Sequence, residues 1–169
     1  DEGRADWADR HTQMQRWHEQ MMQADRAPSP TQQDGSASDE STIPLDAVNA
    51  ASLYARQCAT CHGDDGAGMR RVYPPLAGSA WVTGDPERLA RLLLHGLQGR
   101  IEVKGTFYNG VMPAFGQRLS NAEIAALMTH LRTSWGNAAD SVSAEVVRSV
   151  RARHANRTSP WTAEEIAHP

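Results

Sequence analysis

The segment "CATCHGDDG", residues 58–66, contains the only two cysteines of this 169-residue chain, and a histidine follows the second one directly. Cysteines at this spacing serve in disulfides, zinc half-sites, redox-active dithiols and haem attachment. A disulfide between Cys58 and Cys61 closes a very short loop, and the stability gained from a cross-link grows with loop length. A tetrahedral zinc site needs about four ligands, and the other histidines form no pair with ligand-like spacing.

A redox-active dithiol of the thioredoxin type follows a strand in a βαβ unit, and no strand is predicted before Cys58. The spacing C-x-x-C-H is typical of covalent haem c attachment, in which both thiols bind the vinyl groups and the histidine ligates the iron. The sequence therefore favours one covalent haem c held by Cys58 and Cys61, with His62 as the first iron ligand.

The second axial ligand decides whether such an iron carries electrons or binds small molecules. Among the six methionines, three lie near the N-terminus, Met69 follows His62 by only seven residues, and Met128 lies in the apolar run of a predicted helix. Met112 lies in the predicted loop "NGVMPAFG", where Pro113 restricts the residue before it to an extended backbone. We predict that Met112 is the second ligand, whereas His95 and His130 are expected to have structural roles.

Helices with recognisable caps are predicted to position these residues. The first is expected to start at an Asp46 N-cap and to lead into the cysteines. The second has Asp85 as N-cap and Pro86 at its first position, and it runs to Gly96. The third has a capping box of Ser120 and Glu123. The Gly- and Pro-rich residues 63–84 and the turn-rich residues 99–116 are expected to be loops.

Segments of different composition flank this central region. Residues 1–47 form an acidic arm and linker, since residues 1–48 carry ten acidic and four basic side chains. Within the arm, residues 5–22 predict an amphipathic helix with Trp7, Met14, Trp17 and Met21 on one stripe. Residues 26–44 predict an extended linker. The C-terminal extension, residues 137–169, is expected to contain one helix from about Ser143 and another capped by Thr162.

Composition excludes several classes of protein. The chain has a net charge of −3 and no dense basic patch, so no nucleic-acid partner is expected. It has no run of about 18 apolar residues, so no transmembrane segment is expected. Since haem c is attached outside the bacterial cytoplasm, we expect a periplasmic or extracytoplasmic protein whose leader has been removed. A lipid anchor upstream of Asp1 would tether it to a membrane.

The central region, residues 48–136, resembles the class I c-type cytochromes. The resemblance rests on "LYARQCATCHG", "YPPLAGSAW", "LLLHGLQGRIEVKGTFYNGVMPAFG" and "LSNAEIAALMTHLRTSWGN", which occur in the family's order and spacing. It implies an all-α fold wrapped around one covalent haem c. It also implies that the Pro74 carbonyl accepts a hydrogen bond from His62 and that Leu76 packs on the haem, and it supports the roles given above to Cys58, Cys61, His62 and Met112.

The family also crosses its first and last helices through a small residue and two aromatic ones. Ala50 and Tyr54 match this pattern on the first helix, and Leu127 matches it on the last. His130 stands where an aromatic side chain is usual, so the sequence departs from the family at this crossing.

The resemblance implies an electron carrier, not an enzyme in its own right. We expect a subunit of a larger membrane-associated respiratory complex, such as alternative complex III, with the N-terminal arm contacting the other redox subunits. A cytochrome c subunit or soluble acceptor of a periplasmic dehydrogenase is the main alternative. A haem sensor or a peroxidase would require an open iron site without Met112 as a ligand.

Overall fold

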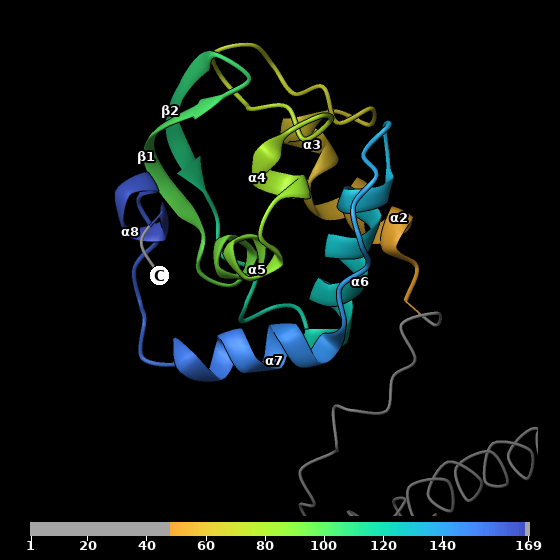
Figure 1. The fold of residues 1–169 in the computed structure, drawn as a ribbon, viewed down its shortest axis with the longest axis vertical. Coiled ribbons are helices and arrows are strands. Elements are labelled where there is room, and N and C mark those ends of the chain that lie inside the picture. Colours follow the sequence, from red (N-terminus) through yellow and green to blue (C-terminus); the bar gives the residue numbers. More distant parts are fainter. Residues whose placement is uncertain (1–47, 168–169) are drawn as a thin grey trace, which may run out of the picture. The chain divides into compact units, whose positions relative to one another are not determined.

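The computed structural model describes residues 48–167, which form short helices around one β-hairpin (Figure 1). The elements in chain order are α2 (Ala50–Gln57), α3 (Ala59–His62), α4 (Ala80–Thr83), α5 (Pro86–His95), β1 (Leu97–Val103), β2 (Thr106–Met112), α6 (Asn121–Thr133), α7 (Ala144–Arg153) and α8 (Ala163–Ala167). The predicted arm helix, the linker and the predicted Asp46 cap lie outside the described residues.

The caps of the central helices lie where the sequence predicts them. The Asp85 carboxylate accepts hydrogen bonds from two N–H groups in the first turn of α5, and Gly96 ends this helix with φ +81°. Ser120 and Glu123 form the predicted capping box at the start of α6. The first helix is an exception, because α2 is capped by Asn49, whose side chain accepts from the backbone N–H of Ser52.

The expectation of an all-α fold was wrong in one respect, because residues 97–112 form an antiparallel hairpin rather than a loop. Leu97 pairs with Met112 at its open end and Val103 with Thr106 at its turn. Lys104 and Gly105 connect the strands with φ values of 50° and 73°. Positive φ at both central residues is typical of the two-residue turns that match the twist of a hairpin. The fold is therefore helical with one small sheet.

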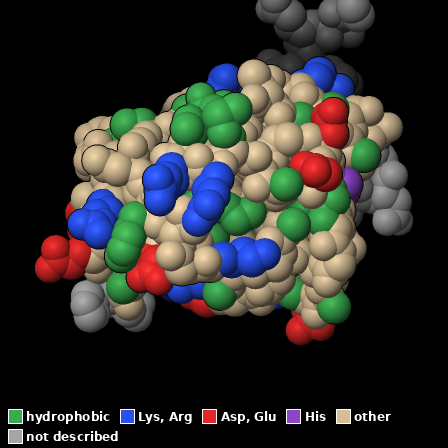
Figure 2. Space-filling view, turned by 90° about the horizontal axis from the view of Figure 1, so that it is seen from above, with side chains coloured by type: hydrophobic (Ala, Val, Ile, Leu, Met, Phe, Trp, Pro, Cys, Tyr) green, Lys and Arg blue, Asp and Glu red, His purple; other side chains and the backbone are tan. Residues whose placement is uncertain are grey.

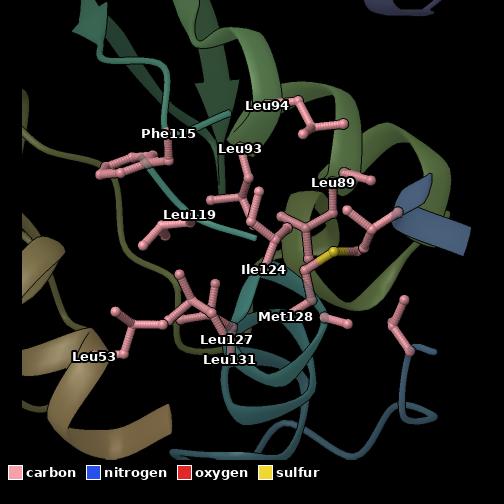
Figure 3. Close-up of a cluster of buried hydrophobic side chains, with 14 of the residues drawn as sticks. Leu53, Leu89, Leu93, Leu94, Phe115, Leu119, Ile124, Leu127, Met128 and Leu131 are labelled. Carbon is pink, nitrogen blue, oxygen red and sulfur yellow. The ribbon is translucent and has the colours of Figure 1, made fainter. Parts of the chain in front are cut away.

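The main core lies between α2, α5, α6 and α7 (Figure 3). Leu127 and Met128 on α6 are completely buried, so Met128 has the core position that the sequence predicts. Deleting a side chain of this size from such a position costs about 2–5 kcal/mol, since the surrounding atoms do not close the gap. The core thus holds together the two helices that come before and after the central loops.

Aromatic side chains complete the crossing of α2 and α6. The Tyr54 ring lies 5.7 Å from the His130 ring and 4.9 Å from the ring of Trp135, measured between centroids. The Tyr54 hydroxyl donates to the Gly63 carbonyl at 2.5 Å, and burial raises the pKa of this phenol. Trp135, which follows α6, supplies a second ring beside Tyr54, in addition to that of His130 on the helix.

The C-terminal helices fold onto the central region at two places. Helix α7 packs on α5 and α6, below both in Figure 1, and it buries Val147 and Val150 completely. Trp161, which precedes α8, forms a backbone bridge with Leu97 of β1. Helices begin near Ser143 and Thr162, as predicted. None of the described helices has the length and apolar character needed to cross a membrane.

Candidate functional site

The two cysteines and the histidine lie at the junction of α2 and α3. The Cys58 N–H, just after α2, donates to the Tyr54 carbonyl within that helix, and the Cys58 carbonyl accepts from the His62 N–H at 3.0 Å. Cys58 is buried, whereas Cys61 is exposed. Burial, and secondarily the neighbouring Cys61 thiol, raises the pKa of Cys58 to about 11. The helical turn thus presents two thiols in different environments and directs His62 into the protein.

The His62 ring is held in one orientation by the loop that follows it. Its Nδ1 lies 2.8 Å from the Pro74 carbonyl oxygen, and since a carbonyl can only accept, this nitrogen carries the proton. Burial lowers the pKa of His62, although the bond to Pro74 opposes this shift. The ring is therefore neutral with an unprotonated Nε2, which is the form that binds a metal.

Gly68 allows the loop that carries Pro74 to pack closely against His62. It has φ +67°, and its N–H donates to the His62 carbonyl at 2.7 Å. A Cβ at this position would lie 2.4 Å from the Tyr73 carbonyl oxygen and 2.7 Å from that of Pro74. Any other residue at position 68 would push away the carbonyl that orients the histidine.

A cavity with two adjoining lobes lies next to His62. One lobe has a volume of about 570 Å³ and the other about 590 Å³, both including their open mouths. The residues that line both lobes are His62, Pro74, Leu97, Ile101 and Met112. Cys58 and Leu76 line the first lobe and Cys61 lines the second, so all six predicted site residues meet at this cavity.

The walls of the cavity suit a large, flat, apolar group. Besides the residues named above, the first lobe is lined by Pro75, Ser79, Trp81, Val82, Leu89, Leu92, Leu93, Val103 and Leu131. A haem c fits this donor set, because two thiols, a neutral imidazole and a thioether border one apolar space.

The hairpin contributes wall residues that the sequence analysis missed. Leu97, Ile101 and Val103 point to the cavity from β1, and Tyr108 does so from β2. Their alternation with more polar residues, followed by Lys104 and Gly105, is a signal for a strand and a tight turn. That signal was present in the segment interpreted as loops.

Met112 is the last residue of β2 and is half-buried, so it is not part of a free loop as predicted. Its backbone is packed tightly, because a Cβ on Gly96 would lie 2.5 Å from the Met112 carbonyl oxygen. Met69 is 57% exposed and pairs with Tyr73 in a β-bridge. Among the described methionines, Met112 alone lines the cavity.

His95 lies away from the cavity walls. Its ring contacts those of His154 and Trp161 at centroid distances of 6.2 and 6.3 Å. Burial, followed by the charges of His154 and nearby arginines, lowers the pKa of His95. His130 packs against Tyr54 instead, so both histidines have structural contacts.

Apolar side chains are exposed at the mouth of the second lobe. Val72, Tyr73 and Val111 line this lobe and are 51%, 38% and 73% exposed. Figure 2 views the molecule from the end that carries the hairpin turn and the loop after α3, and it shows hydrophobic side chains next to several Lys and Arg side chains. The mouth of the cavity is therefore bordered by exposed apolar side chains.

Comparisons with known proteins found one family and several relatives that match this chain. A family described as cytochrome c oxidase, cbb3-type, subunit III, matches residues 46–131. A cytochrome c-552 of Thermus thermophilus is 43% identical over 120 residues, which cover 66% of this chain and 80% of that protein. The cytochrome c subunit of a quinone-type alcohol dehydrogenase from Gluconobacter oxydans is 38% identical over 104 residues, 60% of this chain and 21% of that subunit. The gluconate 2-dehydrogenase cytochrome c subunit of Pantoea cypripedii is 38% identical over 114 residues, 63% of this chain and 24% of that subunit.

Proposed function

This chain belongs to the family of c-type cytochromes described as cytochrome c oxidase, cbb3-type, subunit III, so it carries one haem c and transfers electrons, and from that premise we propose how it holds the haem and where it works. Cys58 and Cys61 would form the thioether links to the haem, and His62, through Nε2, and Met112 would ligate its iron. The observation that carries this assignment is the neutral His62, fixed by Pro74 at the wall of a cavity that Met112 and both thiols share.

When bound, the haem supplies a reversible one-electron couple. The protein's residues set the conditions for it. The Pro74 carbonyl fixes the plane of the His62 ring and makes Nε2 a better donor. A thioether from Met112 favours the reduced state and raises the potential. Leu76 and the apolar wall of α5 would exclude water from the haem, and ligation by both His62 and Met112 would leave no position for a substrate.

Electrons enter and leave at the mouth of the second lobe. The opening is bordered by Cys61, Val72, Tyr73 and Val111, and all four side chains are exposed. A small apolar contact lets two proteins approach closely and separate again, which suits a carrier that must release its partner after each electron.

The host of this cytochrome is a larger respiratory assembly on the extracytoplasmic side of the membrane, with alternative complex III as one candidate. The motivation is the predicted apolar stripe of residues 5–22, joined to the haem domain by a long polar linker. A second candidate is a periplasmic dehydrogenase, in which the chain is a cytochrome subunit or acceptor. Several relatives that are cytochrome subunits of dehydrogenases favour it.

Deletion of residues 1–40 is expected to release the cytochrome from its assembly and to leave its haem spectrum and potential almost unchanged. The reason is that the haem site is built entirely from residues 58–131. The measurement is co-purification of the partner subunits with the full-length and truncated proteins, together with a redox titration of each.

Substitutions within the arm sharpen this test. The double variant Trp7→Ala/Trp17→Ala removes two large side chains from the predicted stripe and should also cause release. Thr12→Ala, on the opposite face of the predicted helix, serves as the matched control. If the truncated protein stays in the assembly, or loses its methionine ligation, the arm does not have the docking role proposed here.

A further inference from the structure

The backbone that follows Met112 is fixed on one side by α5. The Phe115 N–H donates to the Leu93 carbonyl at 2.8 Å, and the Gly116 N–H donates to that of Leu94 at 3.2 Å. A Cβ on Gly116 would lie 2.6 Å from the Leu94 carbonyl oxygen, so the two segments are in close contact. Residues 113–120 thus run tightly along the end of α5 before α6 begins.

Arg151, from α7 in the C-terminal extension, holds the other side of the same segment. Its Nε donates to the Asn121 side-chain oxygen at 2.7 Å, and one terminal nitrogen donates to the Leu119 carbonyl at 2.9 Å. The other terminal nitrogen donates to the Gly116 carbonyl. A guanidinium is a rigid, planar group of donors, so these three bonds fix the relative positions of their acceptors.

The helix that carries Arg151 is itself firmly placed. Val147 and Val150, its neighbours on α7, are completely buried against the core. Phe115 and Leu119 belong to the same core cluster (Figure 3). A movement of residues 113–120 away from α5 would therefore require Arg151 to give up its bonds or α7 to leave the core.

We propose that Arg151 is a positioning residue for Met112, so that the C-terminal extension controls how firmly the methionine binds the iron. This inference rests on the proposed ligation by Met112. Among the residues that Arg151 contacts, Gly116 is the nearest to Met112 in sequence, four residues beyond it. A movement of residues 113–120 would therefore also shift Met112. Trp161 adds a second contact from the extension, because it bridges Leu97, the strand partner of Met112.

The test compares Arg151→Gln with Arg153→Gln in the full-length haem protein. Arg153 lies on the same helix and forms an exposed ion pair with Glu87, so its variant loses the same charge without touching the Met112 segment. For Arg151→Gln we expect a weaker sulfur-to-iron charge-transfer band in the ferric spectrum. We also expect carbon monoxide to bind the reduced form at least about tenfold faster and the midpoint potential to fall. Arg153→Gln should match the wild type in all three.

Arg151→Lys keeps the charge but cannot reach three acceptors in one plane, so it should show an intermediate loss of the band. This variant carries the test if Arg151→Gln does not fold. The inference is overturned if the Arg151 variants lower the melting temperature but keep the wild-type band, carbon monoxide rate and potential. Failure of the ligation itself would look different, because the wild type would then lack the band and Met112→Ala would change nothing.

Discussion

Replacing both cysteines, Cys58→Ser with Cys61→Ser, is expected to abolish covalent haem and to leave a chain that no longer folds cooperatively. The cavity beside His62 has lobes of about 570 and 590 Å³, and its apolar walls would lose their packing partner. Ordering the backbone costs about 1–2 kcal/mol per residue, and a domain retains only about 5–15 kcal/mol of net stability. Because the margin is this small, loss of the large apolar group on which these walls would pack is expected to prevent cooperative folding.

Intact mass and thermal unfolding followed by circular dichroism measure this outcome. The wild type should have the mass of the chain plus one haem and should unfold in one sharp transition, whereas the double variant should have neither property. The single variant Cys61→Ser is the control, since it keeps the buried Cys58 and one thioether. An apo-protein that unfolds cooperatively would show that the core does not depend on the haem.

Replacing Met112 by alanine is expected to leave the haem attached but to open one axial position. The ferric form should become high-spin or bind water, and the reduced form should bind carbon monoxide rapidly. Because the thioether favours reduced iron, the midpoint potential should fall by at least about 120 mV, a hundredfold change in the redox equilibrium at about 59 mV per tenfold.

Met128→Leu is the matched control for this substitution. Met128 is completely buried in the core and does not line the cavity, and such a volume-conserving change costs less than about 1.5 kcal/mol. Its spectrum and potential should equal those of the wild type. If Met112→Ala retains a low-spin, carbon monoxide-resistant iron, another side chain is the ligand and the proposed ligation by Met112 is wrong.

The sequence predicted the helices well where their boundaries depend on local chemistry. Asp85, Pro86 and Gly96 bound α5, and Ser120 with Glu123 starts α6, because caps act within one turn of the chain. The start of α2 was predicted three residues early, since Asp46 and Asn49 are both good caps and only the fold selects between them.

The hairpin was missed because its alternation is short and contains glycines. Gly99 and Gly110, which face each other in the register, resemble turn residues when the strands are read separately. The pairing of Leu97 with Met112 depends on contacts between distant residues, and no local pattern reports it. Met112 was therefore placed in a loop, although it ends a strand that α5 and the C-terminal extension hold in place.

The meeting of the six predicted site residues at one cavity follows from motifs that act together. The C-x-x-C-H spacing places Cys58, Cys61 and His62 on adjoining helical turns, and Gly68 lets Pro74 return to the histidine. The contacts of Arg151 could not be predicted. On a short amphipathic helix, the sequence does not distinguish an arginine that faces solvent from one that donates to a neighbouring side chain and two backbone carbonyls, as Arg151 does.

The most direct test of the account is a spectroelectrochemical titration of the intact protein, recorded across the sulfur-to-iron charge-transfer band. We predict one transition with a slope of about 59 mV per tenfold change, as for a single electron, in which a low-spin ferric form with that band appears on oxidation and disappears on reduction. A ferric form without the band, or a high-spin iron in either state, would contradict an electron carrier ligated by His62 and Met112.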